Sequence, residues 1–267
     1  MTPLQALVLG ILQGLSEFLP ISSSAHLTLA PWLFGWEDPG LSFDVALHFG
    51  TLLAVLWYFR AEWAALIRAT GQIISTRRIE TPEQRRVIYL IIATIPGAVG
   101  GFLLQSKAES AFRNPQITAI ALIVMGILLW IVDKATDQRR VLGEMRWIDA
   151  ALIGLSQVIA LIPGVSRSGS TITTGRGLRF DRESAAEFSF LMSMPIIAAA
   201  VVLEGPKALK AGGLTPELMA GVFASAISGW LAISILMRFV TRHSYGIFAF
   251  YRIALGIAVL AVIYARG

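Results

Sequence analysis

Two stretches of this chain, 144 positions apart, are variants of one another, and each interrupts an apolar segment with proline and a cluster of hydroxyl side chains. The stretches are residues 10–26 (GILQ, then PISSSAH) and residues 154–171 (GLSQ, then PGVSRSGST), with Gln13 matching Gln157, Ser22 matching Ser166 and Ser24 matching Ser168. Such self-similarity indicates an internal repeat. Paired broken helices inside a membrane are where membrane proteins place their substrate and ion sites.

The rest of the chain indicates that a membrane is its solvent. Hydrophobic residues make up 55% of the 267 residues, charged residues only 15%, and the mean hydropathy is +0.69. The apolar runs extend along the whole length, so we expect one transmembrane domain over residues 1–267. The sequence contains no cysteine, which excludes disulfides, thiolate nucleophiles and cysteine-ligated metal sites.

The apolar windows predict an all-α polytopic membrane protein. Six windows have about the 20 residues needed to cross the hydrocarbon, and these are 41–59, 87–104, 117–133, 183–203, 218–238 and 247–265. Two further apolar segments, 3–30 and 148–175, carry proline, glycine and polar residues at their middle, where bare backbone would lack partners in lipid. We therefore predict six full transmembrane helices and two re-entrant helical hairpins.

Lysine and arginine placement tests this topology, because cytoplasmic loops collect these residues. With two re-entrant hairpins, 15 of the 22 basic residues fall on one side, Arg167 and Arg252 lie within membrane segments, and the five on the other side are Lys107, Arg113, Lys207, Lys210 and Arg266. If both broken segments were full spans, the second would change the side of everything after it, and the split would be less uneven. The re-entrant arrangement places the first hairpin on the outer side. It relates residues 1–133 and 134–267 as an inverted repeat.

The first break gathers the residues of an acid/base site. Gln13 and Glu17 are four apart and share a helix face, and that helix should end before Pro20. Ser22, Ser23 and Ser24 can then cap a second short helix whose first turn contains His26. A lone glutamate in an apolar helix is sometimes only a structural hydrogen-bond partner. The nearby histidine favours function, because ionisable groups are costly at membrane depth.

The second break offers complementary chemistry. Ser166, Arg167, Ser168 and Thr171 open a helix with hydroxyls, a guanidinium and free backbone N–H groups. A helix N-terminus attracts phosphate, and the arginine fork matches its oxygens. The alternative is a structural ion pair between Arg167 and a buried carboxylate such as Glu17, and the two roles are compatible when no ligand is bound.

These residues resemble a known family, the undecaprenyl-diphosphate phosphatases of the bacitracin-resistance type. The segment from Glu17 to His26 looks like that family's first signature, and the segment from Pro163 to Thr171 looks like its second. The resemblance implies a bacterial inner-membrane enzyme that removes the terminal phosphate of undecaprenyl diphosphate, recycling the carrier for peptidoglycan synthesis. Because the charge split places the first hairpin on the outer side, we expect the active site to face the periplasm.

The resemblance further implies a divalent cation, Mg²⁺ or Ca²⁺, held by Glu17 with the carbonyl of Gln13, since oxygen ligands suit such ions. Arg167 would neutralise the phosphoryl group, and the substrate-binding hydroxyls would be those of Ser22, Ser166, Ser168 and Thr171. Ser23 is the preferred nucleophile with His26 as acid/base; His26 as nucleophile, or as activator of water, stays open. The expected partners are the polyprenyl diphosphate lipid and membrane lipids, with a homodimer as one option and no nucleic acid.

Two other classes of protein are alternatives to an undecaprenyl-diphosphate phosphatase. Lipid phosphatases of the phosphatidic-acid type need a histidine six residues after the arginine, where this chain has Thr173. A lipid-phosphate transporter would use the same architecture, but it would not need the Glu17, Ser23 and His26 group.

His48 either lines the substrate cavity or bonds a backbone carbonyl. Arg252 is expected to snorkel to the cytoplasmic surface.

Overall fold

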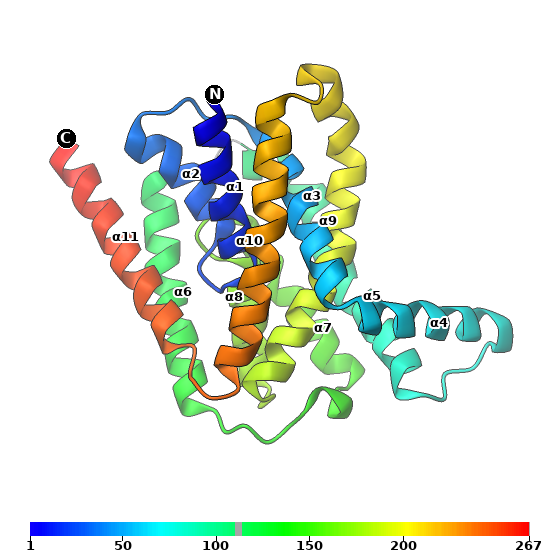
Figure 1. Ribbon diagram of the computed structural model, residues 1–267. Coiled ribbons are helices and arrows are strands. Elements are labelled where there is room, and N and C mark those ends of the chain that lie inside the picture. Colours follow the sequence, from blue (N-terminus) through cyan, green and yellow to red (C-terminus); the bar gives the residue numbers. More distant parts are fainter. Residues whose placement is uncertain (110–113, 267) are drawn as a thin grey trace.

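The computed structural model describes residues 1–109 and 114–266, which form a bundle of helices (Figure 1). In chain order the helices are α1 (Pro3–Phe18), α2 (Ser23–Phe34), α3 (Leu41–Tyr58), α4 (Arg60–Thr76), α5 (Pro82–Glu109), α6 (Pro115–Ala135), the 3₁₀ turn η1 (Leu142–Glu144), α7 (Trp147–Ser156), the 3₁₀ turn η2 (Ile159–Leu161), α8 (Arg167–Gly177), α9 (Arg182–Gly212), α10 (Pro216–Val240) and α11 (Gly246–Arg266). Arg113, counted on the outer side, lies outside the described residues, as do the side chains of Lys107, Lys207 and Lys210. The charge count therefore stays a prediction.

Five helices are long and apolar enough to cross a membrane, and their spanning parts are Pro82–Leu104, Pro115–Ala135, Arg182–Pro206, Pro216–Val240 and Gly246–Arg266. They match five of the six predicted windows. The sixth window, 41–59, is α3, which is followed by α4 at a bend of 83°. In Figure 1 α4 points away from the bundle, across the direction of the long helices. The count reaches six if this bent pair forms one span.

Both repeated segments are broken, as their proline and serine content predicts. The first consists of α1, with 16 residues, and α2, with 12; the second consists of α7, with 10 residues, the turn η2, and α8, with 11. Each piece is shorter than the roughly 20 residues that a straight span needs. Thr2 caps α1 by accepting from the backbone N–H of Gln5, and Pro3 occupies the first turn, where its missing N–H is not required.

Glycine lets the broken helices pack closely on the long ones. A Cβ atom at Gly10 of α1 would overlap the carbonyl of Gly221 on α10, and a Cβ at the matching Gly154 of α7 would overlap the backbone of Ala93 on α5. Small residues at membrane helix interfaces permit such close backbone approach. The matching glycines thus allow α1 to pack closely on α10 and α7 to pack closely on α5.

The C-terminal end of α8 is fixed by a buried ionic cluster. Asp133 of α6 accepts hydrogen bonds from Arg176 Nε at 2.8 Å, from Arg182 Nε at 2.9 Å and from the backbone N–H of Tyr245 at 3.0 Å. Arg176 and Tyr245 are fully buried. A buried carboxylate with this many donors is compensated for its desolvation, and the cluster anchors the helix that carries Arg167 at its other end.

Candidate active site at the two helix breaks

The two breaks share one local geometry. Ser22 and Ser166 both have positive φ, of 78° and 70°, and both cap the helix that follows. Ser22 Oγ accepts from the N–H of Ala25, and Ser166 Oγ accepts from the N–H of Gly169. Each Oγ also lies 3.2 Å from the hydroxyl two residues on. The matched serines therefore do the same structural work twice, by satisfying N–H groups that a helix start leaves free.

The breaks are bonded to one another. The N–H of Gly164 donates to Ser22 Oγ at 3.2 Å, and Ser168 Oγ donates to the carbonyl of Leu19 at 3.2 Å. Residues 142 and 149 positions apart are thus brought into one buried unit. The sequence repeat predicted that the two breaks form the functional site together, and these bonds show that they are in contact.

Arg252 of α11 fastens both breaks, and the prediction that it snorkels to the cytoplasmic surface is wrong. Its side chain is fully buried. Its guanidinium donates to the carbonyl oxygens of Pro20 at 3.2 Å, and of Gly164 and Val165 at 2.8 Å each. Carbonyls freed by the interrupted helices are strong acceptors, so they hold the guanidinium inside instead of releasing it to the interface.

Glu17 is the centre of the polar contacts. Its Oε2 accepts from Ser23 Oγ at 2.6 Å and from Gln13 Nε2 at 3.0 Å, while Oε1 pairs with Arg167 Nη2. Gln13 is fully buried, and Glu17 is 6% exposed. The predicted carboxylate, amide, hydroxyl and guanidinium thus meet at one point, and the structural alternative for Arg167, an ion pair with Glu17, is confirmed for the ligand-free chain.

His48 is the site residue that the sequence did not assign. It lies on α3, and its Nε2 is 3.4 Å from Glu17 Oε2 while its Nδ1 is 2.7 Å from the backbone carbonyl of Asp44. The predicted bond to a backbone carbonyl is therefore confirmed, whereas the alternative role in lining a substrate cavity stays a prediction. The missing signal was long-range: nothing in the residues around position 48 indicates that α3 packs beside the first break.

The side chain of His26 is hydrogen-bonded to groups other than Glu17. Its Nδ1 lies 2.7 Å from the carbonyl of Ser22, and its Nε2 lies 2.7 Å from the hydroxyl of Tyr251, whose ring stacks on the imidazole at 5.7 Å between centroids. Since a carbonyl only accepts, Nδ1 carries a proton, and Nε2 of the neutral ring accepts from Tyr251. Ser23 is bonded to Glu17 and not to His26 in the described contacts, so the acid/base role of His26 stays a prediction.

The hydroxyls predicted to bind substrate are buried and partly engaged. Ser166, Ser168 and Thr171 are each less than 5% exposed, and Thr171 Oγ1 is bonded to the carbonyl of Arg167 at 2.8 Å and to Ser189 at 2.7 Å. Free donor capacity remains on Arg167, whose Nη1 is buried without a hydrogen-bond partner. A buried, unpaired guanidinium N–H is costly unless a ligand accepts from it, so it favours an anion at this break.

The residues present also fit a hard cation. Gln13 Oε1 is buried and has no hydrogen-bond partner, and it belongs to the side chain that contacts Glu17 Oε2. A carboxylate oxygen beside an unused amide oxygen is a donor set suited to Mg²⁺ or Ca²⁺. An anion or a phosphate oxygen bound at Arg167 would release Glu17 Oε1 for the same purpose.

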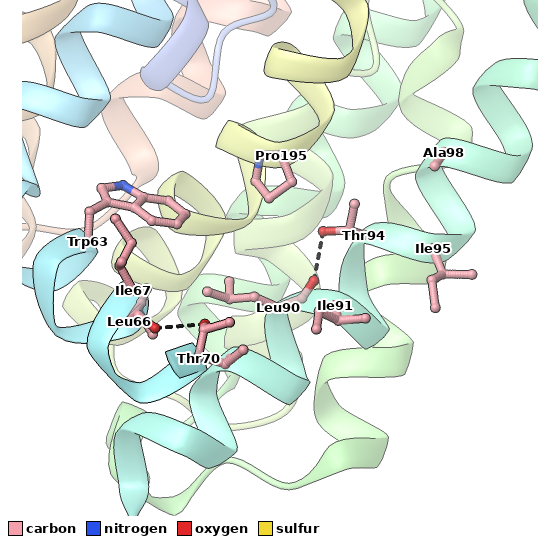
Figure 2. A pocket seen from close by; sticks show the side chains of 11 residues that line it. Trp63, Leu66, Ile67, Thr70, Leu90, Ile91, Thr94, Ile95, Ala98 and Pro195 are labelled. Atoms are coloured by element: carbon pink, nitrogen blue, oxygen red, sulfur yellow. Dashed lines mark hydrogen bonds between the residues drawn. The ribbon is translucent and has the colours of Figure 1, made fainter. Parts of the chain in front are cut away.

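Several apolar cavities open between the described helices. One of about 760 Å³ lies between α3, α9 and α10, with Val45, Phe49 and Ala226 among its lining residues. Another of about 380 Å³ lies between α4, α5 and α9, and Figure 2 shows Trp63 and Pro195 among its lining residues. Val45 and Phe49 lie on α3, the helix that also carries His48, but the residues that contact Glu17 are not among those that line this cavity. Mostly apolar cavities with a few polar groups nearby are typical of ligand sites.

Comparison with known proteins adds an independent finding. Residues 6–258 match the model of the family described as bacitracin resistance protein BacA. A protein of Gemmatimonas aurantiaca named undecaprenyl-diphosphatase is 59% identical over 266 residues, covering all of both chains. Proteins of the same name from Pelotomaculum thermopropionicum, at 49% identity with 100% and 98% of the two chains covered, and Desulforudis audaxviator, at 47% with all of both covered, are also similar.

Proposed function

Because this chain belongs to the BacA family of bacitracin resistance proteins, we propose that it is an undecaprenyl-diphosphatase. It hydrolyses undecaprenyl diphosphate to undecaprenyl phosphate and inorganic phosphate, which returns the lipid carrier to peptidoglycan synthesis and confers bacitracin resistance. The observation that carries this proposal is the contact of Glu17 with both Ser23 and Arg167. The hydroxyl of Ser23 would serve as nucleophile, the carboxylate of Glu17 as proton acceptor and the guanidinium of Arg167 as phosphate ligand, and the three groups meet where the two helix breaks join.

Ser23 is the proposed nucleophile. Its Oγ would bond the terminal phosphorus as the bridging P–O bond breaks and undecaprenyl phosphate leaves, and its proton would pass to Glu17, the carboxylate 2.6 Å away. Water would then hydrolyse the phosphoserine and release inorganic phosphate. His26 retains its proposed acid/base part only if its ring leaves Tyr251, since both nitrogens are occupied.

Arg167 is the proposed phosphate ligand. When a diphosphate enters, its oxygens would compete with Glu17 for the guanidinium, and the unpartnered Nη1 would gain an acceptor. This exchange frees Glu17 as the phosphate is bound. Four hydroxyl side chains would keep the two helix breaks around the phosphate in shape. They would reach the phosphate itself if their present hydrogen bonds open, and they are those of Ser22, Ser166, Ser168 and Thr171.

The carboxylate of Glu17 and the side-chain carbonyl of Gln13 would be the oxygen ligands of a divalent cation, either Mg²⁺ or Ca²⁺. When bound, such an ion neutralises negative charge on the diphosphate. The buried and unpartnered Gln13 Oε1 supports this assignment. The prenyl chain would occupy the 760 Å³ cavity between α3, α9 and α10, because that cavity is lined by apolar side chains and lies along α3, the helix that carries His48.

The proposed topology has six full spans and two re-entrant hairpins in one domain, related as an inverted repeat, in the bacterial inner membrane with the active site toward the periplasm. The shared geometry of the breaks supports the repeat. A cysteine at Ser24 should react with an impermeant thiol reagent applied outside intact cells, while one at Thr76 should not. Labelling at position 76 alone would invert this topology. A homodimer is a further proposal, which cross-linking in native membranes would test.

The reaction itself is tested by phosphate release from a long-chain prenyl diphosphate. Purified protein should release phosphate, a chelator should reduce the rate, and added Mg²⁺ or Ca²⁺ should restore it. Absence of release from a protein with a normal unfolding midpoint would remove the proposed activity. Release that a chelator does not change would remove only the cation.

A further inference from the structure

His48 touches the central carboxylate but has no part in the reaction proposed above. It lies beside Glu17 Oε2 at 3.4 Å, and Ser23 Oγ and Gln13 Nε2 approach the same oxygen at 2.6 and 3.0 Å. Three side chains from two separate segments thus converge on one oxygen atom. This convergence calls for an explanation, since α3 brings its imidazole here from outside both signature segments.

The ring of His48 is fixed by its other nitrogen. The carbonyl of Asp44 lies 2.7 Å from Nδ1, and a carbonyl only accepts, so the Nδ1 proton points to it. In the neutral ring the lone pair of Nε2 then faces the Glu17 carboxylate. Metal-binding histidines are held in this way, with the second nitrogen bonded to a carbonyl or carboxylate. A lone pair facing a carboxylate is unfavourable unless a cation or a proton lies between them.

The amide of Gln13 completes the donor set. Its Oε1 is buried without a partner, and turning the amide over would present this oxygen where Nε2 now contacts Glu17. The described residues contain no group of three histidine, cysteine, aspartate or glutamate side chains placed to hold a metal. The set here is one carboxylate, one imidazole and one amide, so the remaining positions would be left to substrate phosphate or water.

We propose that His48 is a third protein ligand of the catalytic cation, and that the site consequently binds a first-row transition ion such as Mn²⁺ more tightly than Mg²⁺ or Ca²⁺. This inference rests on the proposed function and narrows its cation. Imidazole is a poor ligand for Ca²⁺ and Mg²⁺, which prefer oxygen, whereas transition ions accept nitrogen and oxygen together. The choice of His at position 48 therefore sets metal preference, while Glu17 and Gln13 alone would favour the harder ions.

The test is spectroscopic. Full-length protein in detergent is mixed with Mn²⁺ and methylenediphosphonate, a diphosphate that cannot be hydrolysed, and bound Mn²⁺ is examined by pulsed electron paramagnetic resonance. The wild type should show the nitrogen coupling of a bound imidazole. His48→Gln replaces that nitrogen with amide groups; it should abolish the coupling and weaken Mn²⁺ binding at least about tenfold, with Ca²⁺ affinity less affected.

Matched variants assign the signal. His243→Gln removes an exposed histidine that stacks on Phe239, and it should leave both the coupling and the affinity unchanged. His48→Asn serves as a second variant if His48→Gln unfolds, as judged by the unfolding midpoint. Mn²⁺ bound without imidazole coupling, coupling that survives in the folded His48 variants, or no Mn²⁺ binding would each overturn the proposal.

The outcomes separate this inference from the proposed function. If Mn²⁺ binding depends on Glu17 but shows no imidazole coupling, His48 is not a ligand and the phosphatase proposal is untouched. If the protein releases no phosphate from a prenyl diphosphate with any cation, the proposed function fails even when the coupling is present. Phosphate release and imidazole coupling are therefore read independently.

Discussion

The two helix breaks have the same framework and different chemistry. Counting 144 residues from the first break to the second, serine caps match serine caps, but Glu17 is replaced by Leu161, Ser23 by Arg167 and His26 by Ser170. The capping bonds are preserved in both copies. A duplicated framework can thus supply a carboxylate and a hydroxyl from one copy and a guanidinium from the other, so that neither copy holds the site alone.

The matched glutamines show the same division. Gln13 and Gln157 are both buried and both have an unpartnered Oε1. Gln13 Nε2 contacts the carboxylate of Glu17, whereas Gln157 Nε2 donates to the backbone carbonyl of Ala93 at 2.6 Å. The first glutamine belongs to a polar group, and the second joins two helices. Burial and residue type alone do not distinguish a site residue from its structural copy.

The largest expected effect comes from removing the carboxylate that only the first break has. Glu17→Gln should lower turnover at least about a hundredfold, since it removes the group that faces Ser23, Arg167 and the cation. Phosphate release under saturating prenyl diphosphate measures it. Glu187→Gln makes the same change at a carboxylate paired with Arg86 away from the breaks and should retain turnover. Similar losses in both variants would contradict a special role for the first break.

Arg167→Lys tests the chemistry that only the second break has. Lysine keeps the charge but loses the two-pronged fork for phosphate, so kcat/KM should fall at least about tenfold. Arg140→Lys is the control, because Arg140 makes a forked pair with Asp149 at 2.5 and 3.1 Å outside the site. It should lower the unfolding midpoint while leaving kcat/KM intact. Normal kinetics in Arg167→Lys would reduce Arg167 to a structural ion pair.

The glutamines give a smaller and more selective contrast. Gln13→Leu should lower cation affinity and turnover roughly tenfold, the scale of losing a supporting metal contact. Gln157→Leu should leave the turnover of the folded protein unchanged and lower the unfolding midpoint, because it removes a buried bond to Ala93. Titration of activity with the cation measures the first effect, and thermal unfolding in detergent measures the second. Equal kinetic effects would show that the second break also takes part in the chemistry.

The smallest effects should be the same at both breaks. Ser22→Ala and Ser166→Ala each remove a helix cap and should each lower the free energy of unfolding by about 1 kcal/mol, measured by chemical denaturation. Ser75→Ala, on the exposed face of α4, is the neutral control. If either variant also raises KM while Ser75→Ala does not, the hydroxyl removed in that variant binds substrate, as the sequence predicts for both serines.

Much of this arrangement could be predicted from the sequence, because its signals are local. Proline followed by serines dictates a break and a cap, so both interruptions and five spanning helices are found where the apolar windows and the turn residues place them. The contact of Glu17 with Ser23 follows from the same local chemistry. The pairing of Arg167 with Glu17 was one of two roles that the residues themselves suggested for Arg167, because a buried guanidinium needs a carboxylate or a ligand.

Long-range packing could not be predicted in the same way. His48 reaches Glu17 because α3 packs beside α1, and Tyr251 reaches His26 across 225 positions; neither contact has a sequence period or motif. Arg252 was misjudged for a related reason. Its acceptors are backbone carbonyls, which every residue has, so no side-chain pattern reveals them. The bend between α3 and α4 also has no proline to indicate it.

The clamp formed by Arg252 has a consequence for how the protein is made. The polar side chains that contact Glu17 in the described residues, those of Gln13, Ser23, His48 and Arg167, all lie before position 168. The carbonyls of both breaks are nevertheless joined through a side chain on α11. A nascent chain that has inserted its first ten helices would therefore possess the whole catalytic set, with its breaks joined only by the direct bonds of Gly164 and Ser168. Synthesis of α11 adds the guanidinium that binds the carbonyls of both breaks, so the last helix to be made is the one that clamps the site.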